Sequence, residues 1–240
     1  MNEKIIDFHN HLGEDKDGKK QMPEELIERT KDLIHRSVVF PFDEKNPGKN
    51  FSEANDRILE WAKKYKKLIG FFRINPNEKG FEDEIKRSVE NGLKGMKLHP
   101  RSQNFSLKSK NVKKCLRLAK IYEIPVIIHC GRTVDLGAFE KLAEEFSDLD
   151  LIMGHAGMNR SSEATKIAEK YKNVFLEISI NTQDSVRFIL KHTDINQILF
   201  GSDTPYGDPE VTLKRIDNIN LKKSERKYIL YENARKLLKR

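Results

Sequence analysis

Eight short apolar runs recur along the chain, and amphipathic segments separate them. Each run is four to eight residues of mostly β-branched, aromatic or leucine side chains, a composition typical of buried strands. The runs lie in KIIDFHNH from Lys4, RSVVFPF from Arg36, KLIGFFRINP from Lys67, LKGMKLHP from Leu93, PVIIHCG from Pro125, LIMGHAG from Leu151, NVFLEISI from Asn173 and ILFGSDTP from Ile198.

The segments between these runs have the pattern of amphipathic helices. Apolar residues recur at a spacing of three and four, and Pro23 and Ser52 stand where a helix is expected to begin. The clearest examples are residues 23–35, 52–65, 111–123 and 139–146.

Strands that alternate with helices indicate parallel β-α units, and eight such units close into a barrel. The sequence therefore predicts an α/β fold, a (β/α)8 TIM barrel that forms a single domain over residues 1–240. An open doubly wound sheet is the alternative, but polar residues end six of the eight strands, whereas an open sheet gathers them at one crevice. The segment HLGEDKDGKK after the first strand also lacks the glycine spacing of a dinucleotide loop. Residues 224–240 predict one extra C-terminal helix on the outside of the barrel.

Charge and cysteine content restrict the partners and the compartment. The net charge is +8, but the lysines are scattered along the expected helices, so we expect a solvated surface and no nucleic-acid partner. The two cysteines, Cys115 and Cys130, do not suggest a disulfide framework. The first residues lack the apolar core of a signal peptide, and no stretch approaches the roughly 20 apolar residues of a membrane helix. We expect a cytoplasmic protein with no membrane partner.

Ionisable residues gather at the ends of the expected strands. Five of the seven histidines lie there, which is where a barrel builds its active site from loops, while His35 and His192 end helical stretches. In the first strand, alternation predicts that Asp7, His9 and His11 project from one face. The strand-end residues are His9, His11, Lys97, His99, His129, His155 and Asp203.

Three or four imidazoles with a carboxylate suit a divalent first-row cation such as zinc. An isolated H-x-H pair is usually structural, so His9 and His11 alone do not establish a metal site. The further strand-end histidines and Asp203 change this interpretation, because together they can hold one ion and leave a position open for water.

The order of these motifs resembles the amidohydrolase superfamily, in particular the amidohydrolase 2 branch, which also contains decarboxylases. The resemblance covers nearly the whole chain and rests on DFHNH, GMKLHP, VIIHCG, IMGHAG, FGSDTPYG and the final YENARKLL. It implies a distorted (β/α)8 barrel with one divalent ion, often zinc, with manganese or another first-row ion as the alternative. The residues that match the family's ligands are His9, His11, His129 and Asp203.

The resemblance also implies catalytic roles for two residues. The carboxylate that matches Asp203 touches the metal, accepts a proton from the bound water and returns it to the leaving group. The residue that matches His155 lies beside the water or the substrate, although in binuclear relatives it binds a second ion. A structural His155, bonded to backbone in a tight turn, is the alternative.

Lys97 and His99 share one face of the fourth strand, and their roles stay open. In binuclear relatives a carboxylated lysine on this strand bridges two ions, but the mononuclear branch favours an unmodified Lys97 that orients the substrate. Lys97 could also extend from the barrel rim. His99 is expected either to contact the substrate or to support Lys97 or the ligands.

Further polar residues near strand ends are candidates for substrate binding. Arginines at the mouth of a barrel pair with a carboxylate or phosphate, so together with Lys97 they suggest a small anionic substrate. The candidates are Arg73, Arg101, Arg132, Ser179 and Tyr206.

The sequence thus predicts a metal-dependent hydrolase that uses a metal-activated water on an amide, lactone or ester bond. The main alternative is a non-oxidative metal-dependent decarboxylase of a hydroxy-carboxylate, a group in which the known chains are usually longer. A metal-dependent nuclease and a metal-binding barrel without turnover are weaker alternatives. A homodimer is possible, although the lysines on the helices oppose close packing.

Overall fold

The computed structural model describes residues 3–239, and nine of its strands run parallel. Strands β4 and β5 are separated only by Phe71. Since β4 pairs with β3 and β5 pairs with β6, the two together occupy one strand position, and the nine parallel strands form a barrel of eight positions. The predicted barrel is therefore confirmed. The parallel strands are β1 (Ile6–Glu14), β3 (Arg36–Pro41), β4 (Leu68–Gly70), β5 (Phe72–Arg73), β6 (Met96–Leu98), β7 (Val126–His129), β8 (Leu151–Gly154), β9 (Val174–Glu177) and β10 (Ile198–Leu199).

The barrel closes where the last strand meets the first. Parallel pairing runs from β1 through β3 to β4, and from β5 through β6, β7, β8 and β9 to β10. Between β10 and β1, the Phe8 amide donates to the Phe200 carbonyl over 2.9 Å, and Asn10 pairs with Thr204. A short antiparallel strand, β2 (Lys20–Gln21), extends the end of β1.

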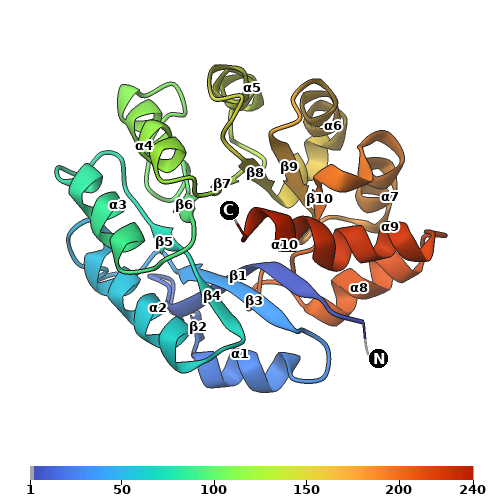
Figure 1. Cartoon of the computed structure of the whole chain (residues 1–240), viewed down its shortest axis with the longest axis horizontal. Coiled ribbons are helices and arrows are strands. Elements are labelled where there is room, and N and C mark those ends of the chain that lie inside the picture. Colours follow the sequence, from blue (N-terminus) through green and yellow to red (C-terminus); the bar gives the residue numbers. More distant parts are fainter. Residues whose placement is uncertain (1–2, 240) are drawn as a thin grey trace.

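Helices surround the strands, as Figure 1 shows in a view down the barrel. Several begin at residues suited to that position: Pro23 opens the first helix, and the Asp135 side chain accepts a hydrogen bond from the Ala138 amide. The helices are α1 (Pro23–Thr30), α2 (Ser52–Lys64), α3 (Phe81–Glu90), α4 (Lys110–Ile121), α5 (Leu136–Glu145), α6 (Ser161–Lys170), α7 (Gln183–His192), α8 (Pro209–Asp217), α9 (Lys223–Lys227) and α10 (Asn233–Leu237), with a π-helical turn at Tyr228–Glu232 and 3-10 turns at Lys49–Phe51, His155–Arg160 and Ile195–Gln197. Among the described residues, no helix is both long and apolar enough to cross a membrane.

The sequence predicted a C-terminal helix on the outside of the barrel. This prediction is wrong for α10. Ala234 and Leu237 of α10 belong to the same buried cluster as Ile6, Val38 and other strand residues that fill the barrel interior. Figure 1 shows α10, at the red end of the chain, lying across the ring of strands. The short strands leave apolar side chains uncovered at one end of the barrel, and α10 covers them. The last residue of the predicted helix, Arg240, lies outside the described residues.

A bulge in β1 determines which side chains reach the site. The register with β3 shifts between Asp7 and Asn10, so the strict alternation expected from the sequence is broken there. Phe8 packs in the barrel interior, and His9 also faces inward, with its ring centroid 5.0 Å from that of Phe40. The bulge therefore separates Asp7 from the face that carries His9 and His11, and corrects the prediction that all three share it.

Candidate active site

A cavity of about 310 Å³ opens at the carboxyl ends of the strands. A cavity of this size suits a small organic molecule. Seven of the residues that line it were selected from the sequence. They are His11, Arg73, His99, His129, His155, Asp203 and Tyr206.

Asp203 lies between two histidines of β1. Its Oδ1 atom is 3.3 Å from Nε2 of His9 and 3.2 Å from Nε2 of His11. The backbone of Asp203 has a positive φ of 63°, and its amide donates to the His9 carbonyl over 2.8 Å. This strained turn just after β10 directs the carboxylate inward, toward the histidines.

His155 and His129 come from neighbouring strands and lie against one another. Nε2 of His155 is 3.1 Å from Nδ1 of His129, and Nδ1 of His155 is 2.8 Å from the hydroxyl of Ser179. The ring of His129 also stacks on that of His99, with centroids 3.8 Å apart. His155 has a positive φ of 64°, so the chain turns sharply where it leaves β8.

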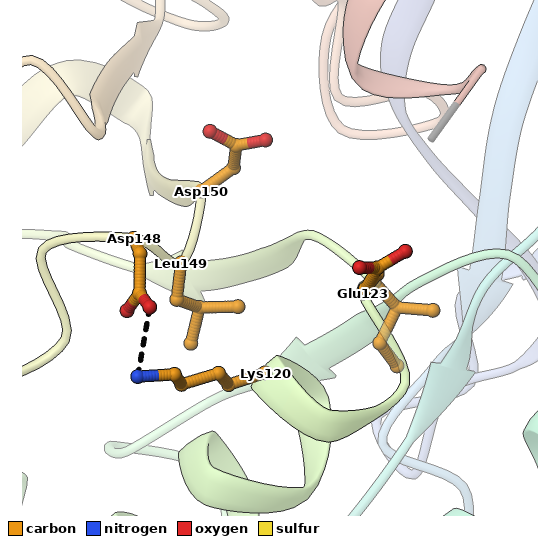
Figure 2. A pocket seen from close by; sticks show the side chains of 6 residues that line it. Lys120, Glu123, Asp148, Leu149 and Asp150 are labelled. Carbon is orange, nitrogen blue, oxygen red and sulfur yellow. Dashed lines mark ion pairs between the residues drawn. The ribbon is translucent and has the colours of Figure 1, made fainter.

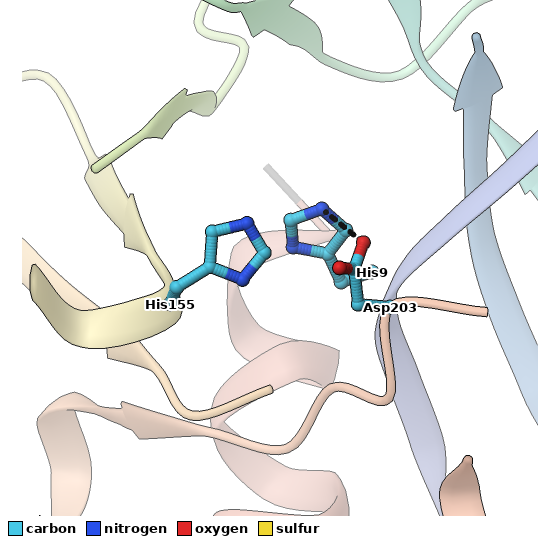
Figure 3. A group of neighbouring side chains, drawn as sticks. All are labelled: His9, His155 and Asp203. Carbon is cyan, nitrogen blue, oxygen red and sulfur yellow. Dashed lines mark ion pairs between the residues drawn. The ribbon is translucent and has the colours of Figure 1, made fainter. Parts of the chain in front are cut away.

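The arrangement of donor atoms fits a divalent cation. Ligand atoms of His9, His155 and Asp203 lie within 4.8 Å of one another, and Figure 3 shows the three side chains turned toward one point. Ligands at about 2.1 Å from an ion lie about 3.0 to 3.4 Å from each other, close to the separations that Asp203 makes with His9 and His11. Imidazole nitrogens with one carboxylate oxygen are also the donors that zinc and similar ions prefer.

Comparison with known proteins identifies the family. The model of the family Amidohydro_2, described as amidohydrolase, matches residues 6–240. The chain belongs to the amidohydrolase family. A search of curated protein sequences found no match.

Solved structures confirm the TIM-barrel fold of this amidohydrolase. An uncharacterized TIM-barrel protein from Bordetella bronchiseptica is 16% identical, with a TM-score of 0.80 and 98% of each chain covered. A probable 2-pyrone-4,6-dicarboxylic acid hydrolase from Acinetobacter baumannii is 16% identical, with a TM-score of 0.74 over 98% of this chain and 99% of that one. A 5-carboxyvanillate decarboxylase from Sphingomonas paucimobilis is 11% identical, with a TM-score of 0.76 and 99% of each chain covered. At these identities the similarity shows the fold alone.

Burial keeps the imidazoles of the amidohydrolase site neutral, the form in which histidine binds a metal. Desolvation lowers the pKa of all five site histidines well below the usual 6.5, and nearby positive charge adds to this effect. Burial also raises the pKa of Asp203 well above its usual range, although Lys97 opposes that shift.

Lys97 is enclosed in the protein and does not line the cavity. Its Nζ atom lies 3.2 Å from Nε2 of His9 and 4.4 Å from the ring centroid of Phe40. Burial lowers the pKa of Lys97 to about 7 against the attraction of Asp203. The lysine therefore contacts His9 and not the cavity. Its predicted contact with the substrate and the alternative of a carboxylated, metal-bridging lysine both stay predictions.

Of the remaining residues predicted to bind the substrate, two line the cavity and three do not. Arg73 and Tyr206 line it. Ser179 is fully buried beneath His155, and it holds that ring. Arg101 and Arg132 have exposed side chains in the turns after β6 and β7 and do not line the cavity. Contacts of these last three residues with a substrate stay predictions.

Arg73 is the buried cation of the cavity. Its side chain is 1% exposed, and its Nη2 atom donates to the Ser102 hydroxyl over 2.5 Å. Its Nη1 atom donates to the Pro41 carbonyl over 3.3 Å, and Asp43 lies 3.6 Å away. Burial lowers its pKa to about 10, so the guanidinium stays charged near neutral pH.

Several site residues were not selected from the sequence. Glu177, at the end of β9, contacts both His9 and His155, and its signal was a charged residue within the apolar run VFLEISI. The others line the cavity from the loops after β1, β3, β6 and β9, where no local pattern distinguished them. They are Asp15, Lys16, Asp43, Ser102 and Ile180.

A larger hollow of about 530 Å³ lies at the opposite end of the barrel. It is formed just before β7 and β8, and Figure 2 shows its acidic residues and the ion pair of Lys120 with Asp148, 2.8 Å long. No histidine lines this hollow, and the group of metal-ligating side chains found among the described residues lies elsewhere. We therefore assign the chemistry to the carboxyl ends of the strands.

Proposed function

We propose that this amidohydrolase is a metal-dependent hydrolase of an amide, lactone or ester bond in a small anionic substrate. One observation carries the proposal: the Asp203 carboxylate contacts both His9 and His11 and also faces the cavity. A carboxylate in this position can accept a proton from water beside a bound substrate. Hydrolysis requires such a base, whereas loss of carbon dioxide requires no attacking water.

We keep His9, His11, His129 and Asp203 as the residues that would hold one ion, zinc or another first-row cation such as manganese. The structure groups His155, and not His129, with His9 and Asp203, but Nε2 of His155 lies only 3.1 Å from Nδ1 of His129. When bound, such an ion supplies Lewis acidity and lowers the pKa of water. Asp203 would take up the proton at a carboxylate oxygen and then deliver it to the leaving atom. His155, held through Nδ1 by Ser179, would present its Nε2 atom beside the adjacent His129, where it can accept a hydrogen bond from the water or the substrate.

Arg73 supports an anionic substrate. Its charge is buried at the cavity wall, and Asp43, the nearest acid, lies 3.6 Å away and also pairs with Lys16. A carboxylate or similar anion in the cavity would complete the partners of the guanidinium. Since Arg101 and Arg132 lie outside the lining, the cavity suits a substrate with few negative charges.

Decarboxylation of a hydroxy-carboxylate is the second candidate. A decarboxylase is among the solved structures of similar fold, and it matches over 99% of both chains. The compactness of this chain therefore gives no reason to prefer hydrolysis. The preference for hydrolysis rests on Asp203 and not on chain length.

The test is a substrate screen with zinc-loaded and manganese-loaded protein. Lactones, esters and amides that carry a carboxylate would be compared with their uncharged counterparts and with ortho-hydroxy aromatic carboxylates. We expect turnover of a charged ester, amide or lactone, with one oxygen atom from ¹⁸O-labelled water in the product. Release of carbon dioxide without incorporation of ¹⁸O would instead establish the decarboxylase.

A further inference from the structure

Glu177 is a buried carboxylate that gathers four hydrogen bonds at the last residue of β9. Its Oε2 atom lies 2.6 Å from Nδ1 of His9, and it accepts from the His155 amide over 3.1 Å and from the Ser179 hydroxyl over 3.0 Å. Its Oε1 atom accepts from the Ser179 amide over 2.6 Å. The side chain is completely buried, so water does not compete for these bonds.

These contacts determine which nitrogen of His9 carries the proton. An ionised carboxylate can only accept hydrogen bonds, and one backbone amide, which can only donate, faces each oxygen of Glu177. The Nδ1 atom of His9 must then donate. Its Nε2 atom is left with a lone pair, and that atom is the one that lies 3.3 Å from Asp203.

The same carboxylate acts on His155 through Ser179. The Ser179 hydroxyl donates its single proton to Glu177, so it can only accept from Nδ1 of His155, 2.8 Å away. His155 is therefore also protonated at Nδ1, which leaves a lone pair at Nε2. One carboxylate thus contacts the ring of His9 on β1 directly and the ring of His155, just after β8, through Ser179.

Gly201 provides the space for this arrangement. A Cβ atom at residue 201 would lie 2.1 Å from Oε1 of Glu177, so any side chain there would displace the carboxylate. The glycine follows β10, on the loop that leads to Asp203. The loop therefore approaches the carboxylate more closely than any other residue type would allow.

We propose that Glu177 is a positioning residue that fixes His9 and His155 as Nδ1-protonated imidazoles and so prepares Nε2 of His9 to bind the metal. The inference rests on the proposed function only for the identity of the group that His9 binds. Partners of this kind typically change metal affinity by about 10- to 100-fold when they are removed.

The first measurement uses the unmodified, metal-free protein. Long-range ¹H–¹⁵N correlation spectra report the tautomer of each histidine, and His9→Gln and His155→Gln variants assign the two signals. We expect the Nδ1–H tautomer for both rings. An Nε2–H tautomer at His9 would overturn the proposal without reference to any variant of Glu177.

The second measurement is calorimetric titration with Zn²⁺. Glu177→Gln keeps the shape of the side chain, but its amide group must place an N–H against another donor. We expect mixed tautomers and at least a tenfold loss of Zn²⁺ affinity. Gly201→Ala, which displaces the carboxylate and keeps its charge, should change both readouts in the same direction. Unchanged tautomers and affinity within twofold in Glu177→Gln would refute the positioning role.

Glu84→Gln is the matched control. Glu84 is also a buried glutamate, bonded to Asn55, Arg87 and Ser88, but it lies on α3, and its hydrogen bonds within the described residues reach no site histidine. It should leave the tautomers and the Zn²⁺ affinity unchanged. If the unmodified protein binds Zn²⁺ yet hydrolyses nothing, the proposed function fails while Glu177 keeps its role. If it binds no Zn²⁺, the tautomers still decide the role of Glu177.

Discussion

The hydroxyl of Thr204 donates a 2.6 Å hydrogen bond to the side-chain oxygen of Asn10. This bond joins the loop that carries Asp203 to the strand that carries His9 and His11. Both residues are completely buried, and Gln21 donates to the Thr204 hydroxyl from the other side over 3.2 Å. His9, His11 and Asp203 thus lie where the first and last strands close the barrel.

Thr204→Val should therefore affect both the fold and the metal site. The substitution keeps the shape but leaves the Asn10 oxygen without its best donor, which should lower the free energy of unfolding by about 1 to 3 kcal/mol. Zn²⁺ affinity should fall as well. Thr212→Val removes a buried hydroxyl from α8, and it should lower stability without changing Zn²⁺ affinity. Urea denaturation and calorimetry measure the two effects, and equal affinities in both variants would contradict the role of Thr204.

The position of α10 over one end of the barrel leads to a second prediction. Leu237 is 3% exposed and packs with the interior residues of the strands. Leu237→Ala should lower the free energy of unfolding by about 2 to 5 kcal/mol, the range for a buried leucine. Ile121→Ala, at a side chain that is 70% exposed, should change it by less than about 0.5 kcal/mol. A small effect at Leu237 would mean that α10 is not required to cover the interior.

The barrel could be predicted from the sequence, because each strand is an apolar run and the helices between them show apolar residues at a spacing of three and four. It did not locate α10, because an amphipathic helix looks the same whether it covers the side or the end of a barrel. The sequence also placed His9, His11, His129, His155 and Asp203 at one end of the barrel, because parallel strands bring their carboxyl ends together.

Other parts of the site could not be derived from periodicity. The bulge in β1 breaks the alternation that placed Asp7 with His9, and it depends on pairing with β3. Glu177 acts through contacts with residues more than twenty positions away. Arg73 is the last residue of β5 and lines the cavity, whereas Arg101 and Arg132 lie in turns whose conformation the strand pattern does not predict.

We predict a single divalent ion per chain. Elemental analysis after growth with added zinc or manganese should give about one ion, because the described residues form a single group of converging ligand atoms, from His9, His155 and Asp203. His9→Ala should abolish binding, and removal of the ion by a chelator should abolish activity until metal is restored. His192→Ala, on α7 far from these ligands, should bind normally. Two ions per chain, bridged by a carboxylated Lys97, would contradict the prediction but not the family.

Asp203→Asn separates proton transfer from metal binding. The amide keeps one oxygen ligand but loses the charge and the ability to accept a proton at that site. Turnover should drop by about 10² or more, the scale for loss of a general base, while metal occupancy falls only modestly. Asp184→Asn, at an exposed position in the first turn of α7, should leave both unchanged. Full activity in Asp203→Asn would show that this residue is not the proton carrier.

Arg73 should determine the preference for anionic substrates. Arg73→Lys keeps a positive charge but loses the planar group that can hold a carboxylate through two hydrogen bonds. A hydrogen bond to a charged group contributes about 1.5 to 3 kcal/mol, so KM for an anionic substrate should rise by about tenfold or more. KM for its uncharged analogue should change little. Arg132 has an exposed side chain outside the cavity and serves as the control. Arg132→Lys should leave KM for both the anionic and the uncharged substrate unchanged. An equal loss for charged and uncharged substrates in Arg73→Lys would mean that Arg73 supports the cavity wall through Pro41 and Ser102 and does not bind the anion.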